Sequence, residues 1–272
     1  MMKERETMLK KPGICFMLCI IVFGFYGCAA EQQSTKPHGT LTQIAIFDAL
    51  ASGIYDGRMT LAEVKQYGDS GIGTFQGLDG ELLMMDGIIY KISFDGSVSI
   101  PELNTLTPYA TVAFFDTNRE VRLSDGVNMS GLAEIVDSKL PTPNLFYMFR
   151  IEGTFQKMKT RSLQKQEKPY PPLTEAVKKQ SVFEFENVEG VMIGLRCPPY
   201  MKGLNAPGYH LHFLSKDKKA GGHVLDFRTQ QAVVKVSVIS KFAMVIPESQ
   251  DIYKHDFAKE NIDLRQVIQP KQ

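Results

Sequence analysis

The histidines are the residues of this sequence whose spacing points most clearly to chemistry. The chain has five histidines, and His210, His212 and His223 share one short window, GYHLHFLSKDKKAGGHVLDF. On a β-strand, residues two positions apart point to the same face, so His210 and His212 would lie side by side. The polar stretch KDKKAGG predicts a turn that brings His223 back beside them. Three imidazoles would then converge on one point.

This arrangement of imidazoles indicates a metal site. Imidazole binds zinc, copper, iron and nickel well. Three protein ligands with open positions are typical of catalytic zinc sites, whereas structural sites are closed by four ligands. The window contains no cysteine that could close the site. The alternative is three surface or core histidines without a metal. His38 and His255 lie in a linker and a charged tail, so we expect them to be exposed and not to bind metal.

The N-terminus has the pattern of an export signal over residues 1–30. A basic start precedes an uncharged apolar run from Gly13 to Gly27, and small residues follow. This run is shorter than the roughly 20 residues of a membrane-spanning helix, although a retained N-terminal anchor is the alternative. Gly27 followed by Cys28 also indicates lipoprotein processing, with Cys28 as the lipidated residue. We therefore expect an exported protein, either a cell-envelope lipoprotein or a secreted one.

Processing would leave Cys197 as the one cysteine of the body, so no internal disulfide can form. Cys197 follows a hydrophobic run and precedes two prolines, which favours a structural thiol over a catalytic one. Hydrophobic residues make up 43% and charged residues 22% of the chain, as in an ordinary globular protein. The formal net charge of +1 argues against nucleic acid as a partner.

The local patterns predict an α+β fold dominated by antiparallel strands. Residues 31–40 form a polar linker, and helical signals follow over 42–50, 54–70 and 128–139, with a capping box from Thr60 to Glu63. Short segments of alternating polarity from Gly71 onward predict strands joined by tight turns. A loop over 161–172, rich in Lys, Gln and Pro, marks a candidate domain boundary before a second strand-rich half.

Several segments together resemble the α-acetolactate decarboxylase family. The histidine window is similar to the family's metal motif, GTFQGLDGELLMMDGIIY to its acidic segment, and KMKTRSLQKQEKPYPPL to its arginine segment. The segments keep the family's order from about Leu41 to about Asp263. The resemblance implies conversion of (S)-2-acetolactate to (R)-acetoin and CO2, with Zn2+ on His210, His212 and His223.

The resemblance also implies roles for three further residues and an architecture. Glu81 and Arg161 would be catalytic, with Arg161 also binding substrate, and Thr74 would be a substrate-binding residue of the pocket. From the residues alone, Glu81 could instead be a turn acid and Arg161 part of a basic loop. The family fold implies a mixed, mostly antiparallel β-sheet domain over 41–165, followed by a small β-barrel domain over 166–272 that carries the three histidines, usually in a homodimer.

One segment departs from the family pattern. The family's C-terminal tail carries a further glutamate that reaches the active site, but here the tail reads NIDLRQVIQPKQ. Gln269 or Gln272 falls near that position, and Glu260 and Asp263 lie upstream of it. This departure leaves open how a proton is transferred.

Two other functions fit the same histidines. A cupin-like metalloenzyme, an oxygenase or isomerase, would use a similar set with an additional carboxylate ligand and a redox metal. A non-enzymatic surface lipoprotein would bind a metal or ligand without turnover. In each case the partner is a small molecule, which is 2-acetolactate for the decarboxylase, and contact with a membrane comes only from the N-terminal lipid anchor.

Overall fold

The computed structural model describes residues 38–259 and residue 268. The predicted export signal with Cys28, most of the linker, and the tail residues Glu260, Asp263, Gln269 and Gln272 lie outside the described residues. Within the described part of the chain, no helix is both long enough and apolar enough to cross a membrane.

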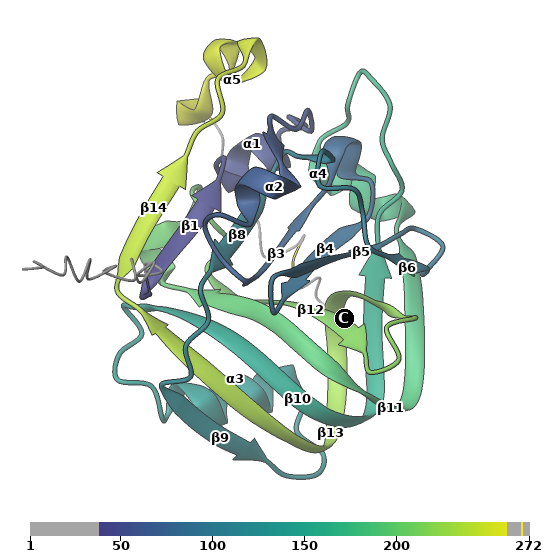
Figure 1. The fold of residues 1–272 in the computed structure, drawn as a ribbon, viewed down its shortest axis with the longest axis vertical. Helices are drawn as coiled ribbons and strands as arrows, with labels where there is room; N and C mark the ends of the chain where they lie inside the picture. Colours follow the sequence, from purple (N-terminus) through teal and green to yellow (C-terminus); the bar gives the residue numbers. More distant parts are fainter. Residues whose placement is uncertain (1–37, 260–267, 269–272) are drawn as a thin grey trace, which may run out of the picture. The chain divides into compact units, whose positions relative to one another are not determined.

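The first of two large sheets is mixed and has seven strands, in the order β14-β1-β8-β3-β4-β5-β6 (Figure 1). Its one parallel pair joins β1 to β14, and the other neighbours are antiparallel. The strands are β1 (Thr40–Ile44), β3 (Ser70–Thr74), β4 (Glu81–Met85), β5 (Ile88–Ile92), β6 (Val98–Ser99), β8 (Ala110–Ala113) and β14 (Lys241–Val245).

The second large sheet is antiparallel and closes into a ring. Its order is β10-β11-β12-β13-β9, and β13 pairs with β10 as well, so four strands enclose a common interior. The strands are β9 (Arg119–Leu123), β10 (Phe146–Ser162), β11 (Ser181–Cys197), β12 (Gly208–Ser215) and β13 (Gly221–Ile239). A mostly β structure was predicted, but the pairing of β10 with β13 joins segments far apart in the chain and left no local signal.

The helices are short. They are α1 (Phe47–Ala51), α2 (Leu61–Val64), α3 (Met129–Asp137), α4 (Leu173–Ala176) and α5 (Gln250–Lys254), with 3-10 turns at Gln76–Leu78, Val177–Lys179, Pro199–Met201 and Phe257–Lys259. A two-stranded sheet pairs β2 (Met59–Thr60) with β7 (Leu106–Thr107). Figure 1 shows α1 and α2 near β1 and β8, and α3 beside β9 and β10.

The predicted helices were partly right. The capping box is present, with the Thr60 side chain and Glu63 bonded reciprocally. The helix predicted over 128–139 is confirmed as α3, whose N-cap is Asn128. The helix predicted over 42–50 was wrong in its first part, because residues 42–44 belong to β1. There β1 lies between β14 and β8, and the hydrogen bonds of its backbone go to these two strands. This pairing overrides the helical spacing of the apolar residues. The helix predicted over 54–70 shrinks to α2.

The ring has an aromatic interior. Phe149, Phe155, Phe213 and Phe227 are buried there, with Leu211 among them. The helix α3 packs Leu132 and Val136 against the same cluster. Leu211 and Phe213 therefore face the core, as the alternation along the histidine strand predicted.

The two large sheets do not divide the chain at residue 165. The strands β9 and β10 precede that point and belong to the ring, whereas β14 follows it and pairs with β1. The sheet order does not test where the domains divide, so the boundary at residue 165 stays a prediction.

The strand β12, which carries His210 and His212, lies so close to β11 that β11 has no space for a side chain at Gly194. Gly194 in β11 lies opposite Leu211, and a Cβ added there would lie 2.0 Å from the carbonyl oxygen of His210. We expect Gly194→Ala to push β12 away from β11, lowering both metal content and melting temperature, as measured by elemental analysis and calorimetry. Gly131→Ala is the matched control, because the added Cβ in α3 comes no closer than 3.3 Å to a side chain. Normal metal content in Gly194→Ala would contradict this account.

Candidate metal centre

The ring brings the three window histidines together, as predicted. His210 and His212 lie on β12, and His223 at the start of β13 is paired directly with His212. The ring centroids are separated by 5.2 Å for His210–His212, 4.9 Å for His210–His223 and 5.4 Å for His212–His223. One nitrogen from each ring lies within 4.8 Å of the other two, which is close enough for a shared metal ion.

Backbone carbonyls orient two of the three rings. His212 Nδ1 lies 2.8 Å from the Leu82 carbonyl oxygen, and His223 Nε2 lies 2.8 Å from the Ile268 carbonyl oxygen. A carbonyl only accepts, so each of these nitrogens donates a proton and the other nitrogen of each ring keeps its lone pair. The lone pairs of His212 Nε2 and His223 Nδ1 therefore face the cluster, where His223 Nδ1 lies 3.1 Å from His210 Nε2.

The protonation state of the three histidines also suits a metal ion. Burial is the largest cause that lowers the pKa of all three, to about 3 for His212, and the nearby Arg161 guanidinium lowers each further. They are therefore neutral, which is the form that binds metal. His212 Nε2 is buried and has no hydrogen-bond partner among the described residues. A buried acceptor without a partner costs free energy, which a metal ion at this point would offset.

Glu81 and Arg161 lie beside the histidines. Glu81 begins β4, and its Oε2 is 3.5 Å from His212 Nε2; Arg161 on β10 is paired directly with His223. A guanidinium nitrogen of Arg161 lies 3.9 Å from Glu81 Oε1, so the two charges attract without a direct hydrogen bond. Burial raises the pKa of Glu81 to about 7, although Arg161 opposes the shift. Glu81 can therefore gain or lose a proton near neutral pH.

Thr74 contributes to the site through the turn that precedes Glu81. It ends β3 directly opposite Glu81, and its hydroxyl donates to the Gly80 carbonyl oxygen at 2.7 Å. Gly80 has a φ of +91°, and an added Cβ would lie 2.4 Å from the Ile92 carbonyl oxygen. Thr74 and Gly80 therefore fix where β4 begins and where the Glu81 carboxyl lies.

A cavity of about 40 Å³ lies among these residues and a set of hydrophobic side chains. The predicted residues Thr74, Glu81, Arg161 and the three histidines form one side of it. The rest is lined mainly by hydrophobic residues: Phe47, Leu50, Leu78, Tyr109, Leu163, Leu173 and Ile268. The sequence did not single these out, because nothing in their local pattern distinguishes them from core residues.

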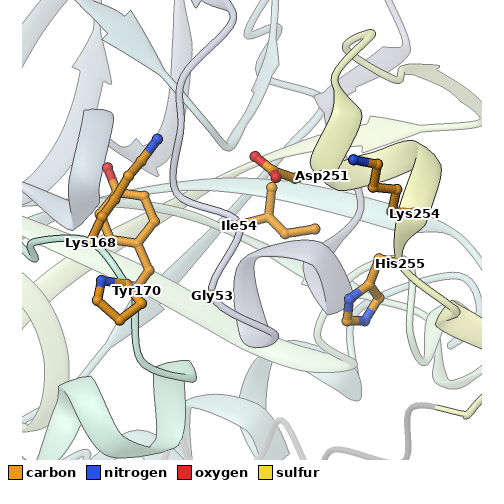
Figure 2. Close-up of a pocket in the computed structure, with 8 residues that line it drawn as sticks. Gly53, Ile54, Lys168, Tyr170, Asp251, Lys254 and His255 are labelled. Carbon is orange, nitrogen blue, oxygen red and sulfur yellow. The ribbon is translucent and has the colours of Figure 1, made fainter.

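A second pocket lies at the surface and is more open (Figure 2). Lys168 and Tyr170 line it, and both bind Asp56, with the Tyr170 hydroxyl donating at 2.9 Å. Asp56 therefore compensates the charge of Lys168. His255, on the rim of this pocket, is half-buried rather than exposed as expected, and His38 is exposed. Neither belongs to the metal-binding group found among the described residues.

The fold and this site define a protein with a buried cluster of three histidines that could hold a metal ion, positioned by strands of a ringed sheet. The model of the family described as alpha-acetolactate decarboxylase matches residues 41–259. The chain therefore belongs to the alpha-acetolactate decarboxylase family, as the resemblance of its motifs indicated.

Individual relatives agree over most of their length. The chain is 43% identical to an alpha-acetolactate decarboxylase of Methanosarcina mazei over 83% of this chain and 78% of that one. It is 36% identical to that of Bacillus subtilis strain 168 over 85% of this chain and 92% of that one. The crystal structure of alpha-acetolactate decarboxylase from Bacillus subtilis strain 168 superposes with a TM-score of 0.82 and 34% identity, covering 85% of this chain and 99% of that one.

Cys197 is not among the residues that line the cavity, and it packs in an apolar cluster with Met148 and Leu195. Its side chain is buried, and burial raises the pKa of its thiol well above the ordinary value. We expect Cys197→Ala to retain turnover within about twofold and to lower the free energy of unfolding by about 1 kcal/mol, as measured by steady-state assay and urea titration. A loss of turnover with unchanged stability would instead make the thiol catalytic.

Proposed function

We propose that the protein converts (S)-2-acetolactate to (R)-acetoin and CO2, with zinc held by His210, His212 and His223. The observation that carries this proposal is the buried cluster of three neutral imidazoles beside Glu81 and Arg161, in a chain of the alpha-acetolactate decarboxylase family. As the relatives' name says, they are decarboxylases of acetolactate.

Decarboxylation requires a group that accepts the electron pair of the broken carbon–carbon bond. Loss of CO2 leaves two electrons on the carbon that carried the carboxylate, and these are tolerable only if they spread into the neighbouring ketone. When bound, zinc supplies a Lewis acid for the ketone and hydroxyl oxygens of the substrate. The two lone pairs that the Leu82 and Ile268 carbonyls direct inward give the site two of its three ligand atoms.

Arg161 supplies positive charge that does not depend on pH. Its guanidinium is buried and presents a planar fork of donors, which suits the substrate carboxylate or the paired oxygens left after CO2 departs. Because Arg161 is paired with His223 across the sheet, the position of this charge relative to the histidines is fixed by the register. We assign Arg161 to substrate binding and to stabilising the developing negative charge.

Glu81 is placed to hold or deliver a proton. A single handedness of product requires protonation from one face, and Glu81 approaches the histidines from one side, at the start of β4. Its raised pKa, caused by burial, allows the protonated carboxyl to persist near neutral pH. Hydrophobic residues that also line the cavity, among them Phe47, Leu50 and Leu163, would limit the access of water to the reacting carbon.

The donor set favours zinc over a redox metal. Among the described residues, the group that could share an ion consists of three histidines and includes no carboxylate. A cupin-like oxygenase or isomerase would add a carboxylate ligand. Elemental analysis of the purified protein separates these functions: zinc is expected, and iron or manganese would favour the cupin-like alternative.

Three further proposals rest on the sequence pattern and the family resemblance. The chain would be exported, either anchored through a lipid on Cys28 or secreted, and would form a homodimer. The ring of strands would be the small β-barrel domain of the family, beside the mixed-sheet domain. Labelling with a radioactive fatty acid, compared with Cys28→Ser, tests the anchor, and sedimentation of the processed protein tests the dimer.

Loss of one imidazole should remove the metal. We expect His210→Ala and His223→Ala each to lower zinc content to near zero and to abolish acetoin formation in a colorimetric assay, because two remaining ligands hold the ion weakly. Treatment of the unaltered protein with a chelator should have the same effect, reversed by added zinc. Full zinc content with normal turnover in both variants would refute the site.

Loss of the Glu81 acid should separate chemistry from metal binding. We expect Glu81→Gln to keep zinc content but to lower kcat by roughly 100-fold or more, the usual contribution of a general acid or base. The control Glu175→Gln alters an exposed glutamate on α4 and should leave kcat and zinc content unchanged. An unaltered kcat in Glu81→Gln would exclude Glu81 as the proton donor.

A further inference from the structure

One hydrogen bond to the histidine cluster comes from Ile268, near the end of the sequence. The Ile268 carbonyl oxygen accepts from His223 Nε2 at 2.8 Å, although 45 positions separate the two residues in the sequence. Ile268 is 5% exposed, and its side chain joins the hydrophobic cluster of Phe47, Leu50 and Leu173. Apolar burial therefore holds this residue, and its carbonyl, beside the imidazole.

The contact determines which nitrogen of His223 is available as a ligand. A neutral imidazole carries one proton, and the Ile268 carbonyl draws it to Nε2, which leaves the Nδ1 lone pair facing His210. His212 shows the same arrangement with the atoms reversed: the Leu82 carbonyl accepts from Nδ1 and leaves Nε2 facing the cluster. The two rings thus present different nitrogens, and each depends on a different backbone carbonyl.

We propose that Ile268 is a positioning residue of the metal centre, whose carbonyl fixes His223 as a ligand through Nδ1. This inference rests on the proposed metal site. It adds a residue that does not bind the metal but accepts a hydrogen bond from one of its ligands. Leu82 is held within β4, in the middle of a sheet, whereas Ile268 depends on its side-chain packing. Loss of such an outer partner lowers metal affinity by about 10- to 100-fold.

Two shortened chains test this contact. One ends at Gln269 and keeps the Ile268 carbonyl within a peptide bond, and the other ends at Val267 and lacks it. We expect the chain ending at Gln269 to match the full chain in zinc affinity, measured by competition with a chromophoric chelator, and the chain ending at Val267 to bind zinc about 10- to 100-fold more weakly. Equal affinity in the two shortened chains would overturn the inference.

A second measurement needs no variant and identifies the ligand atom directly. In the zinc-loaded full chain labelled with 15N-histidine, long-range proton–nitrogen correlation spectra should show His223 bound through Nδ1 and protonated at Nε2, and His212 the reverse. A His223 bound through Nε2 would overturn the inference while leaving the metal site intact. A full chain that binds no zinc would instead refute the proposed function itself. This measurement decides the matter even where the chain ending at Val267 fails to fold.

Discussion

Burial of three imidazoles at one point is the constraint on which the site depends. Protonated rings so close together would repel, and burial, the largest of several causes, lowers the pKa of each and so favours the neutral form. Neutral rings expose lone pairs, and two of the rings, His212 and His223, direct their protons outward to the carbonyls of Leu82 and Ile268. The ligand set therefore follows from the sheet pairing that buries the rings and from the two carbonyls that orient them.

The same low-polarity surroundings act in the opposite direction on the neighbouring acid. Removal from water disfavours the charged form of any group, so it lowers the pKa of a histidine and raises that of Glu81. Neutral metal ligands and a carboxyl that can be protonated near neutral pH thus have one physical cause. Arg161 limits the shift at Glu81 and supplies a positive charge where substrate carboxylate would bind.

The sequence predicted those parts of the site that follow from local periodicity. Alternation along a strand placed His210 and His212 on one face and Leu211 on the other, and a polar turn returned His223. Residues 42–44 were missed as strand because pairing with β14 and β8, far along the chain, decides their conformation. The carbonyl partners of the histidines were also missed, because every residue has a carbonyl and only the folded chain shows which one reaches an imidazole.

X-ray absorption spectroscopy at the zinc edge of the purified, metal-loaded protein tests the central claim most directly, because it counts the ligands by element. We predict a shell of nitrogen and oxygen atoms at about 2.0–2.1 Å with the multiple-scattering pattern of three imidazoles and no sulfur. A sulfur shell, fewer than three imidazoles, or protein that retains no metal would contradict the account of a three-histidine centre.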